Sequence, residues 1–185
     1  MTTEEILRDC AGKNGAYISI PGLDDPAGIK SSDFVKIKVG SDKAADVLNS
    51  ILQRFEDKRI CVVGTSCCGK TSFASYIGNC VNMAEAICYL LSEEEMEQVM
   101  QSPWTPVTGE AMDRLVKSKI KTQAGFPIFG TVVMDSDFVV YLNISNGMLM
   151  ARCEEQGVSF EDAIKLKEKI ERDLNGLENV IEISY

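Results

Sequence analysis

The most constraining feature of the sequence is a glycine-flanked segment between a short apolar run and a helix-forming stretch. Its residues are Gly64-Thr65-Ser66-Cys67-Cys68-Gly69-Lys70-Thr71, followed by Ser72. Residues 60–63 before it are all apolar, which is typical of a strand covered on both faces. Two glycines let the backbone curl so that successive N–H groups point at one anion, and the following helix adds its positive N-terminus. The segment therefore predicts a strand, an anion-binding loop and a helix, in that order.

Two side chains give this loop its chemistry. The segment matches G-x-x-x-x-G-K-[ST] in full, with Lys70 placed to contact β- and γ-phosphates and the Thr71 hydroxyl placed to ligate magnesium. We therefore predict that residues 64–72 bind the phosphates of a nucleoside triphosphate. The alternative is an ordinary glycine-containing turn whose lysine is solvated.

Hydrophobic patterns along the rest of the chain predict alternating strands and helices. Strands are expected at residues 16–20, 34–39, 60–63, 86–91, 131–134, 138–144 and 180–183. Helices are expected at residues 2–10, 41–55, 108–122 and 160–174, and from about residues 70 and 92. This alternation predicts an α/β fold with a mainly parallel sheet. We expect a core domain at residues 58–185, and an N-terminal βα extension at residues 1–57 packed on the sheet edge.

Composition excludes several classes of protein. The 185 residues include no histidine, which rules out imidazole ligands and bases. With 28 acidic against 19 basic residues, extended nucleic-acid binding is not expected. No apolar run approaches the roughly 20 residues of a membrane helix, and the N-terminus has no signal-peptide pattern, so we expect a cytoplasmic protein without a membrane partner. The seven cysteines have no repeated spacing and suggest no disulfide framework.

Residues 60–80 resemble the Walker A segment of P-loop nucleoside-triphosphate-binding proteins. Residues 137–145, followed by Leu149 and Arg152, are similar to the strand and helix that precede the lid in small nucleoside, nucleotide (cytidylate-like), shikimate and gluconate kinases. The resemblance implies a three-layer P-loop NTPase core that uses ATP and Mg²⁺. It also implies phosphoryl transfer from ATP to a hydroxylated or phosphorylated small acceptor of nucleoside or nucleotide type.

Such a reaction needs partners for the loop. Asp135, which closes the apolar run 131–134 in the manner of a Walker B strand, is the predicted second magnesium ligand beside Thr71, with Asp137 as second choice. The alternative is that both acids belong to a polar turn. Only a few residues separate the run 131–134 from the strand that begins at residue 138, too few for the usual parallel crossover. The earlier stretch is therefore either no parallel neighbour or half of a hairpin.

The resemblance implies that Arg152 offsets phosphate charge, so that Lys70, Asp135 and Arg152 form the predicted catalytic set; a surface salt bridge is the alternative for Arg152. It also implies an acceptor-side acid among Glu93, Glu94 and Glu95, unless these residues only begin a helix. Trp104 could line the acceptor pocket, or serve as a packing anchor.

Residues 152–159 leave room only for a vestigial lid. This departure from the kinases keeps open a second function, a nucleotide-binding regulatory or assembly protein with little or no transferase activity. The extension could be regulatory or could form a homodimer. The thiols of Cys67 and Cys68 lie inside the predicted loop, which suggests redox-sensitive nucleotide binding; the alternative is that they are simply small residues.

Overall fold

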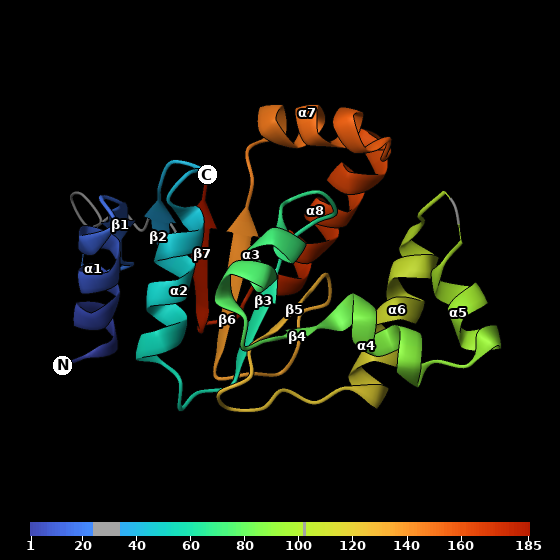
Figure 1. The fold of residues 1–185 in the computed structure, drawn as a ribbon, viewed down its shortest axis with the longest axis horizontal. Coiled ribbons are helices and arrows are strands. Elements are labelled where there is room, and N and C mark those ends of the chain that lie inside the picture. Colours follow the sequence, from blue (N-terminus) through green and yellow to red (C-terminus); the bar gives the residue numbers. More distant parts are fainter. Residues whose placement is uncertain (24–33, 102) are drawn as a thin grey trace.

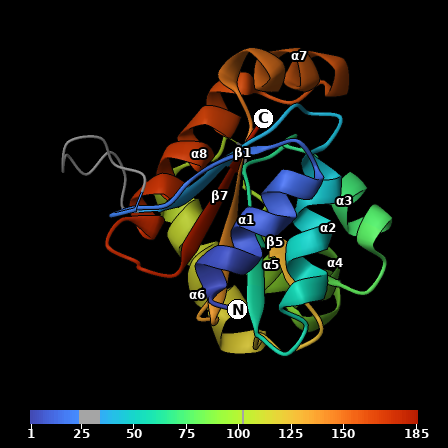
Figure 2. The same cartoon turned by 90° about the vertical axis from the view of Figure 1, so that its left-hand side faces the viewer.

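The computed structural model describes residues 1–23, 34–101 and 103–185. These residues form an α/β fold in which one seven-stranded, mainly parallel sheet carries helices on both faces (Figures 1 and 2). The strands are β1 (Tyr17–Ser19), β2 (Val35–Lys38), β3 (Ile60–Val63), β4 (Val81–Asn82), β5 (Ile128–Gly130), β6 (Phe138–Asn143) and β7 (Val180–Ser184). The helices are α1 (Thr3–Lys13), α2 (Ala44–Arg54), α3 (Lys70–Ile77), α4 (Met83–Leu90), α5 (Glu93–Val99), α6 (Pro106–Lys119), α7 (Asn146–Gln156) and α8 (Phe160–Leu174).

The strand order is β1-β2-β7-β6-β3-β5-β4, which places β3 between β5 and β6. Strand β1 pairs antiparallel with β2, and the other described pairs are parallel. Because parallel strands share a direction, their carboxyl ends meet at one edge of the sheet. The loop after β3 lies at that edge.

Strand β3 is buried on both faces, as its unbroken apolar sequence predicts. Ile60 and Val62 join the core formed with α1, α2 and α3, whereas Cys61 and Val63 join the core on the side of α6 and the C-terminal half of α8. Figure 2 shows the sheet between these two groups of helices.

The N-terminal region is continuous with this sheet. Strand β2 pairs in parallel with β7, and β1 then forms the outer edge. The amphipathic α2 buries Val47, Leu48 and Ile51 in the same core as β3. Helix α1, which starts with a capping box between Thr2 and Glu5, packs beside α2 (Figure 1). The described part of residues 1–57 therefore shares both the sheet and the core of residues 58–185.

The strand predicted at residues 86–91 is wrong. These residues belong to α4, and the strand at this sheet edge is the two-residue β4. The Asn82 side chain accepts hydrogen bonds from the N–H groups of Ala84 and Glu85, which starts the helix. Met83 and Ile87 are buried four residues apart, while Tyr89 is 89% exposed. The apolar run therefore has helical, one-sided burial.

The prediction of a strand at residues 131–134 is also wrong. The structure shows how the chain passes from one parallel strand to the next with so few residues between them. The strand is β5, three residues earlier, and residues 131–137 return to the amino edge of the sheet where β6 begins. They cross one face of β3, where the Cys61 thiol donates to the Val132 carbonyl at 3.5 Å, and Val132 and Met134 are buried. Seven extended residues can span roughly 23 Å, enough to return along a four-residue strand without a helix.

Among the described residues, none of the helices has both the length and the apolar character that crossing a membrane requires.

Candidate functional site

The site is built around the loop of residues 64–71, which leaves the carboxyl end of β3. Its first residue is fixed to the neighbouring strand, because the Gly64 N–H donates to the Gly130 carbonyl at 3.2 Å. In Figure 1 the loop lies beneath α7 and in front of α8. Ligands of open α/β sheets commonly bind at this edge, outside the carboxyl ends of the strands.

The loop backbone requires its two glycines. A Cβ on Gly64 would lie 2.5 Å from the Cys68 Sγ, so a side chain at this position would collide with the inside of the loop. Gly69 has φ +104 and is the N-cap of α3, to which it offers no side-chain hydrogen bond. The first N–H groups of a helix have no acceptor within the helix. The N-terminus of α3 therefore meets the loop without a capping side chain.

Lys70 and Thr71 open α3 at this point. The Lys70 Nζ donates to the carbonyls of Gly64 at 2.9 Å and Thr65 at 2.6 Å, so the ammonium is turned into the loop and not toward solvent. An arriving phosphate would compete with these carbonyls for the ammonium. Ser66, Lys70 and Thr71 all line one cavity described below.

Three hydrogen bonds tie the loop to surrounding elements. The buried Thr65 hydroxyl donates to the Ala163 carbonyl in α8 at 2.5 Å. The Cys68 carbonyl accepts from the Arg152 guanidinium of α7 at 2.9 Å and from the Tyr185 hydroxyl at 2.6 Å. Sequence reasoning missed Tyr185. Its position directly after β7 was the available signal, because a parallel strand delivers its next residue to the loop edge.

Burial raises the pKa of the Tyr185 hydroxyl above its ordinary range, with the neighbouring Cys68 adding to the effect. The phenol therefore stays protonated and remains a hydrogen-bond donor to the loop at neutral pH. Helix α7 and the last residue of the chain together hold the middle of the loop in place.

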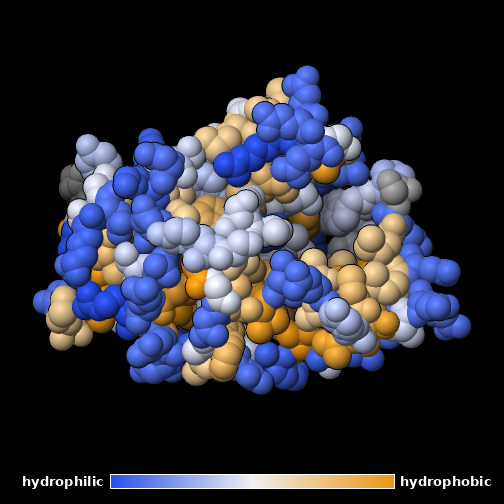
Figure 3. Space-filling model, viewed as in Figure 1, coloured by the Kyte–Doolittle hydropathy of each residue, from blue (hydrophilic) through white to orange (hydrophobic). Residues whose placement is uncertain are grey.

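The inner cavity is a space of about 310 Å³ on one side of the loop, bordered by α3, α4, α5, α6 and α8 and the end of β5. Figure 3 shows the surface hollowed between the part that carries α7 and the part that carries α6. Its walls are mainly apolar, and Trp104 is one of its lining residues. Its polar lining includes Ser66, Thr71, Thr108 and Thr131.

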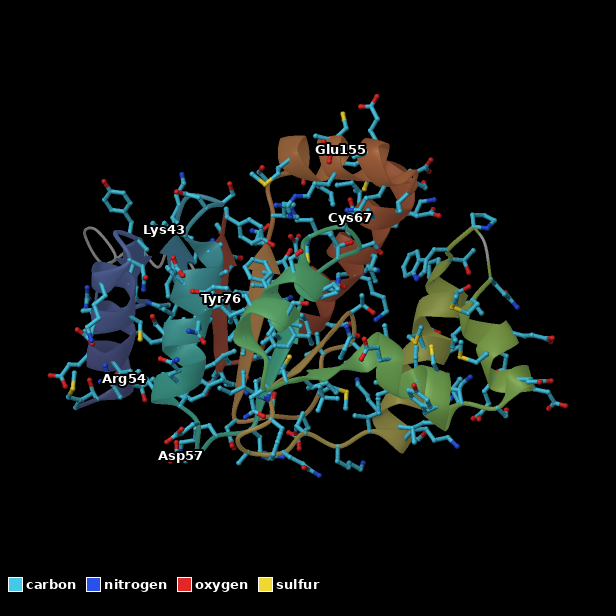
Figure 4. All side chains as sticks on the ribbon, in the orientation of Figure 1. Lys43, Arg54, Asp57, Cys67, Tyr76 and Glu155 are labelled. Atoms are coloured by element: carbon cyan, nitrogen blue, oxygen red, sulfur yellow. The ribbon has the colours of Figure 1, made fainter. Side chains whose placement is uncertain are left out.

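The outer depression is a more open space of about 480 Å³ on the other side of the loop, between α2, α3 and α7. Cys67, Gly69, Phe73, Tyr76 and Arg152 line it. Figure 4 shows Cys67 beneath α7 and Tyr76 directed from α3 toward α2, where its hydroxyl donates to the Asp46 carboxylate at 2.6 Å. The structure thus brings Arg152 to the loop, but on the side away from the inner cavity.

The predicted role of Asp135 and Asp137 as magnesium ligands needs correction, because both residues lie at the opposite edge of the sheet. The Asp137 carboxylate accepts from the Arg59 N–H at 2.8 Å, and Asp135, 96% exposed at its side chain, lies 3.7 Å from the Arg59 guanidinium. Arg59 precedes β3, whereas the loop follows β3. The length of a four-residue strand, roughly 13 Å, therefore separates these acids from the loop.

The residues near the loop fit a protein-held metal ion poorly. The described part of the chain contains no group of three or more acidic or cysteine side chains that could hold a metal. The strand beside the loop ends in Gly130 and Thr131, neither of which is an acid. Among the described lining residues of the inner cavity, Asp113 is the only carboxylate, and it is ion-paired with Lys169 at 2.6 Å. Thr71 is then the remaining predicted ligand.

The acids Glu93, Glu94 and Glu95 do not line the inner cavity. They begin α5, where the Glu95 carboxylate accepts from the Ser92 N–H in a capping box and lies 3.7 Å from the Lys119 ammonium. The structure therefore shows the alternative given for these residues, which is that they begin a helix. The segment predicted to leave room only for a vestigial lid is a short connection in the structure: α7 ends at Gln156, followed by the left-handed Gly157, and α8 begins at Phe160.

The loop thiols differ in exposure. Cys68 is fully buried, with its sulfur 3.8 Å from the Lys70 Nζ. Cys67 is half-buried at φ +62 and its thiol lies 3.5 Å from the Gln156 side-chain oxygen. Burial and a hydrogen bond with Cys67 raise the pKa of the buried Cys153 thiol to about 11. Of the two loop thiols, Cys67 is therefore the accessible one.

A scan against protein-family models finds no match to this chain, and a search of curated proteins finds none either. The functional argument therefore rests on the loop residues and on the two spaces beside them.

Proposed function

We propose that the protein binds a nucleoside triphosphate through the 64–71 loop and transfers a phosphoryl group from it to a small acceptor held in the inner cavity. The observation that carries this proposal is the position of Lys70 and Thr71, which belong both to the loop and to the wall of a mainly apolar cavity. A donor bound in the loop would thereby present its terminal phosphate to the cavity.

The chain's own groups would divide the work. The N–H groups at the start of α3 and the Lys70 ammonium would bind the phosphates, once the ammonium leaves the carbonyls of Gly64 and Thr65. The nucleoside would lie in the outer depression, where Phe73 and the Arg152 guanidinium offer flat surfaces for a base. The apolar walls of the inner cavity would exclude water from the acceptor.

Nucleotide binding is tested by calorimetry with ATP in the presence of magnesium. The wild type is expected to bind, and Lys70→Ala to lose at least tenfold in affinity because a charged hydrogen-bond donor to phosphate is removed, an effect of about 1.5–3 kcal/mol. Lys165→Ala, on the exposed side of α8, is the matched control and should bind like the wild type. Thermal unfolding of each variant establishes that it is folded. Equal affinities of wild type and Lys70→Ala would refute the assignment of the loop.

A second candidate function, nucleotide binding with little transfer, is favoured by one observation. The described residues lining the inner cavity offer no carboxylate other than the ion-paired Asp113. Incubation with ATP and a panel of hydroxylated acceptors separates the two functions. Acceptor-dependent loss of ATP identifies a kinase, whereas tight ATP binding with no acceptor-dependent loss identifies a binding protein.

A further inference from the structure

The charges around the inner cavity restrict what it can hold. Apart from Lys70, which serves the loop, the cationic side chain among the described lining residues is Lys169 of α8. Its ammonium lies 2.6 Å from the Asp113 carboxylate of α6 and 2.6 Å from the Asp173 carboxylate one turn along α8. One ammonium and two carboxylates leave this group, which we call the Lys169 triad, with a net charge of −1.

The Lys169 triad is built into the fold. The Lys169 side chain is 8% exposed and that of Asp113 is 20% exposed, so solvent does little to screen them. Burial lowers the pKa of Lys169, but hydrogen bonds to both carboxylates outweigh this and hold the pKa above its ordinary value. The ammonium therefore stays charged and stays paired. A phosphate or carboxylate in the cavity would have to displace one of these two carboxylates to gain the Lys169 ammonium.

The neighbouring walls leave room for an apolar molecule. A Cβ on Gly109 would lie 2.6 Å from the Trp104 ring and 3.1 Å from the Lys169 side chain, so this glycine lets the indole and the alkyl stem of Lys169 pack together. The remaining apolar lining includes Met83, Ile87, Val99, Met112, Phe129 and Leu166. Pockets of this kind hold ligands by apolar contact, with a few polar groups for orientation.

We infer that the acceptor is an uncharged, largely apolar compound that carries a hydroxyl group, and that the Lys169 triad selects against phosphorylated and carboxylated acceptors. This inference rests on the proposed function only in treating the bound compound as an acceptor. The occupancy of the binding site itself can be measured without nucleotide. The cavity volume of about 310 Å³ is sufficient for a compound of nucleoside size.

The sole tryptophan of the chain, Trp104, lines the cavity and reports its occupancy through intrinsic fluorescence. The experiment titrates the full-length protein with matched pairs: 2-phenylethanol against its phosphate ester, and thymidine against its 5′-monophosphate. We expect at least one neutral member to change Trp104 fluorescence saturably, and to bind at least tenfold more tightly than its phosphorylated partner. Tighter binding of the phosphorylated member in either pair, or no saturable response from any of the four compounds, would overturn the inference.

Variants test the role of the triad. Asp173→Asn removes one carboxylate, leaves Asp113 to pair with Lys169, and should improve binding of the phosphorylated compounds about tenfold relative to their neutral partners. Asp113→Asn should act in the same direction. Glu161→Gln, on the same helix and 79% exposed at its side chain, is the matched charge control and should change neither affinity. Unchanged selectivity in both aspartate variants, each shown to be folded by its melting curve, would contradict the assigned role.

Failure of the proposed function is distinguishable from failure of this inference. Calorimetry with ATP reports on the loop alone, and Trp104 fluorescence without nucleotide reports on the cavity alone. A protein that binds neutral compounds but not ATP would refute the proposed function and retain the cavity assignment.

Discussion

Asp137 shows how a residue that sequence reasoning assigned to chemistry serves the fold. Its carboxylate accepts the Arg59 N–H at 2.8 Å and lies 3.4 Å from the Arg59 guanidinium, which ties the start of β6 to the start of β3. The hydrogen bond from the Arg59 backbone, followed by the Arg59 guanidinium, lowers the pKa of this carboxyl below its ordinary value of 3.8 despite partial desolvation.

The first prediction concerns acid stability. An acid with a lowered pKa in the folded state stabilises the fold at pH values above its ordinary pKa, and this contribution is lost as the pH falls through the folded-state value. Asp137→Asn should therefore lower the melting temperature at pH 6 and lose less further stability than the wild type between about pH 4 and pH 2. Melting curves across this pH range measure both effects.

Asp135→Asn is the control for this prediction. Its side chain is 96% exposed, so its replacement should leave the melting temperature at pH 6 unchanged. Both variants should bind ATP with wild-type affinity, because the strand β3 separates them from the loop. A loss of magnesium-dependent ATP binding in either variant would restore the original assignment of these acids to the metal.

The second prediction concerns the loop thiols. Iodoacetamide should label the exposed Cys88 first, the half-buried Cys67 more slowly, and the buried Cys68 only after unfolding. Because Cys67 borders the outer depression, its labelling should weaken ATP binding, and bound ATP should slow its labelling. Peptide mass spectrometry gives the three rates. Unchanged ATP affinity after complete labelling of Cys67 would contradict the hypothesis that nucleotide binding is redox-sensitive.

At the scale of elements, α4 packs closely over the end of β5 because Gly130 has no side chain. A Cβ on Gly130 would lie 2.6 Å from the Met83 Cβ, an atom that no change of rotamer can move. Gly130→Ala should therefore push α4 away from β5 and lower the free energy of unfolding by about 1–3 kcal/mol. Denaturant unfolding measures this change.

Gly147→Ala is the matched control for Gly130→Ala. Gly147 lies in the first turn of α7 and a Cβ there would meet no atom within 4 Å. Because alanine favours the helix over glycine, this variant should raise the free energy of unfolding by about 0.5–1 kcal/mol. Opposite signs for the two substitutions are the expected outcome, and equal destabilisation would contradict the packing described at β5.

The missing acid at the end of β5 leads to a fourth prediction. Thr131 lines the inner cavity directly after Gly130, which pairs with the last residue of β3. Thr131→Asp should increase the magnesium dependence of ATP binding about tenfold, because a carboxylate would supply the ligand that the site lacks. Thr131→Asn, which has the shape but not the charge, is the control in the same calorimetric titration. Equal magnesium dependence in both variants would contradict this placement.

At the scale of the whole molecule, the described part of residues 1–57 belongs to the same sheet and core as residues 58–185. Without them β7 would become an exposed sheet edge, and the apolar faces covered by α2 would meet water. A chain of residues 58–185 should therefore show no cooperative thermal transition, whereas the full chain should. Circular dichroism during heating checks this. A cooperative transition in the shortened chain would instead identify residues 58–185 as an independent domain.

Several elements could be predicted from local sequence. The strand at residues 60–63 and the helix at residues 160–174 were predicted with their observed bounds, because strand burial and helix capping leave marks within a few residues. The run at residues 86–91 could not be assigned by the same means. An unbroken apolar run fits a buried strand and a half-buried helix equally, and only the neighbours of α4 decide between them.

The candidate site likewise has one part that local sequence predicts and another that depends on the tertiary structure. Sequence by itself determined the loop, since its glycines, Lys70 and Thr71 are contiguous and their spacing reflects backbone geometry. Only the tertiary structure decided that Asp135 lies at the opposite edge of the sheet from the loop, that Tyr185 reaches the loop, and that Lys169 is ion-paired beside the cavity. These facts depend on which strands are neighbours and which end of each strand a residue follows, and such long-range pairings leave no periodic trace in the sequence.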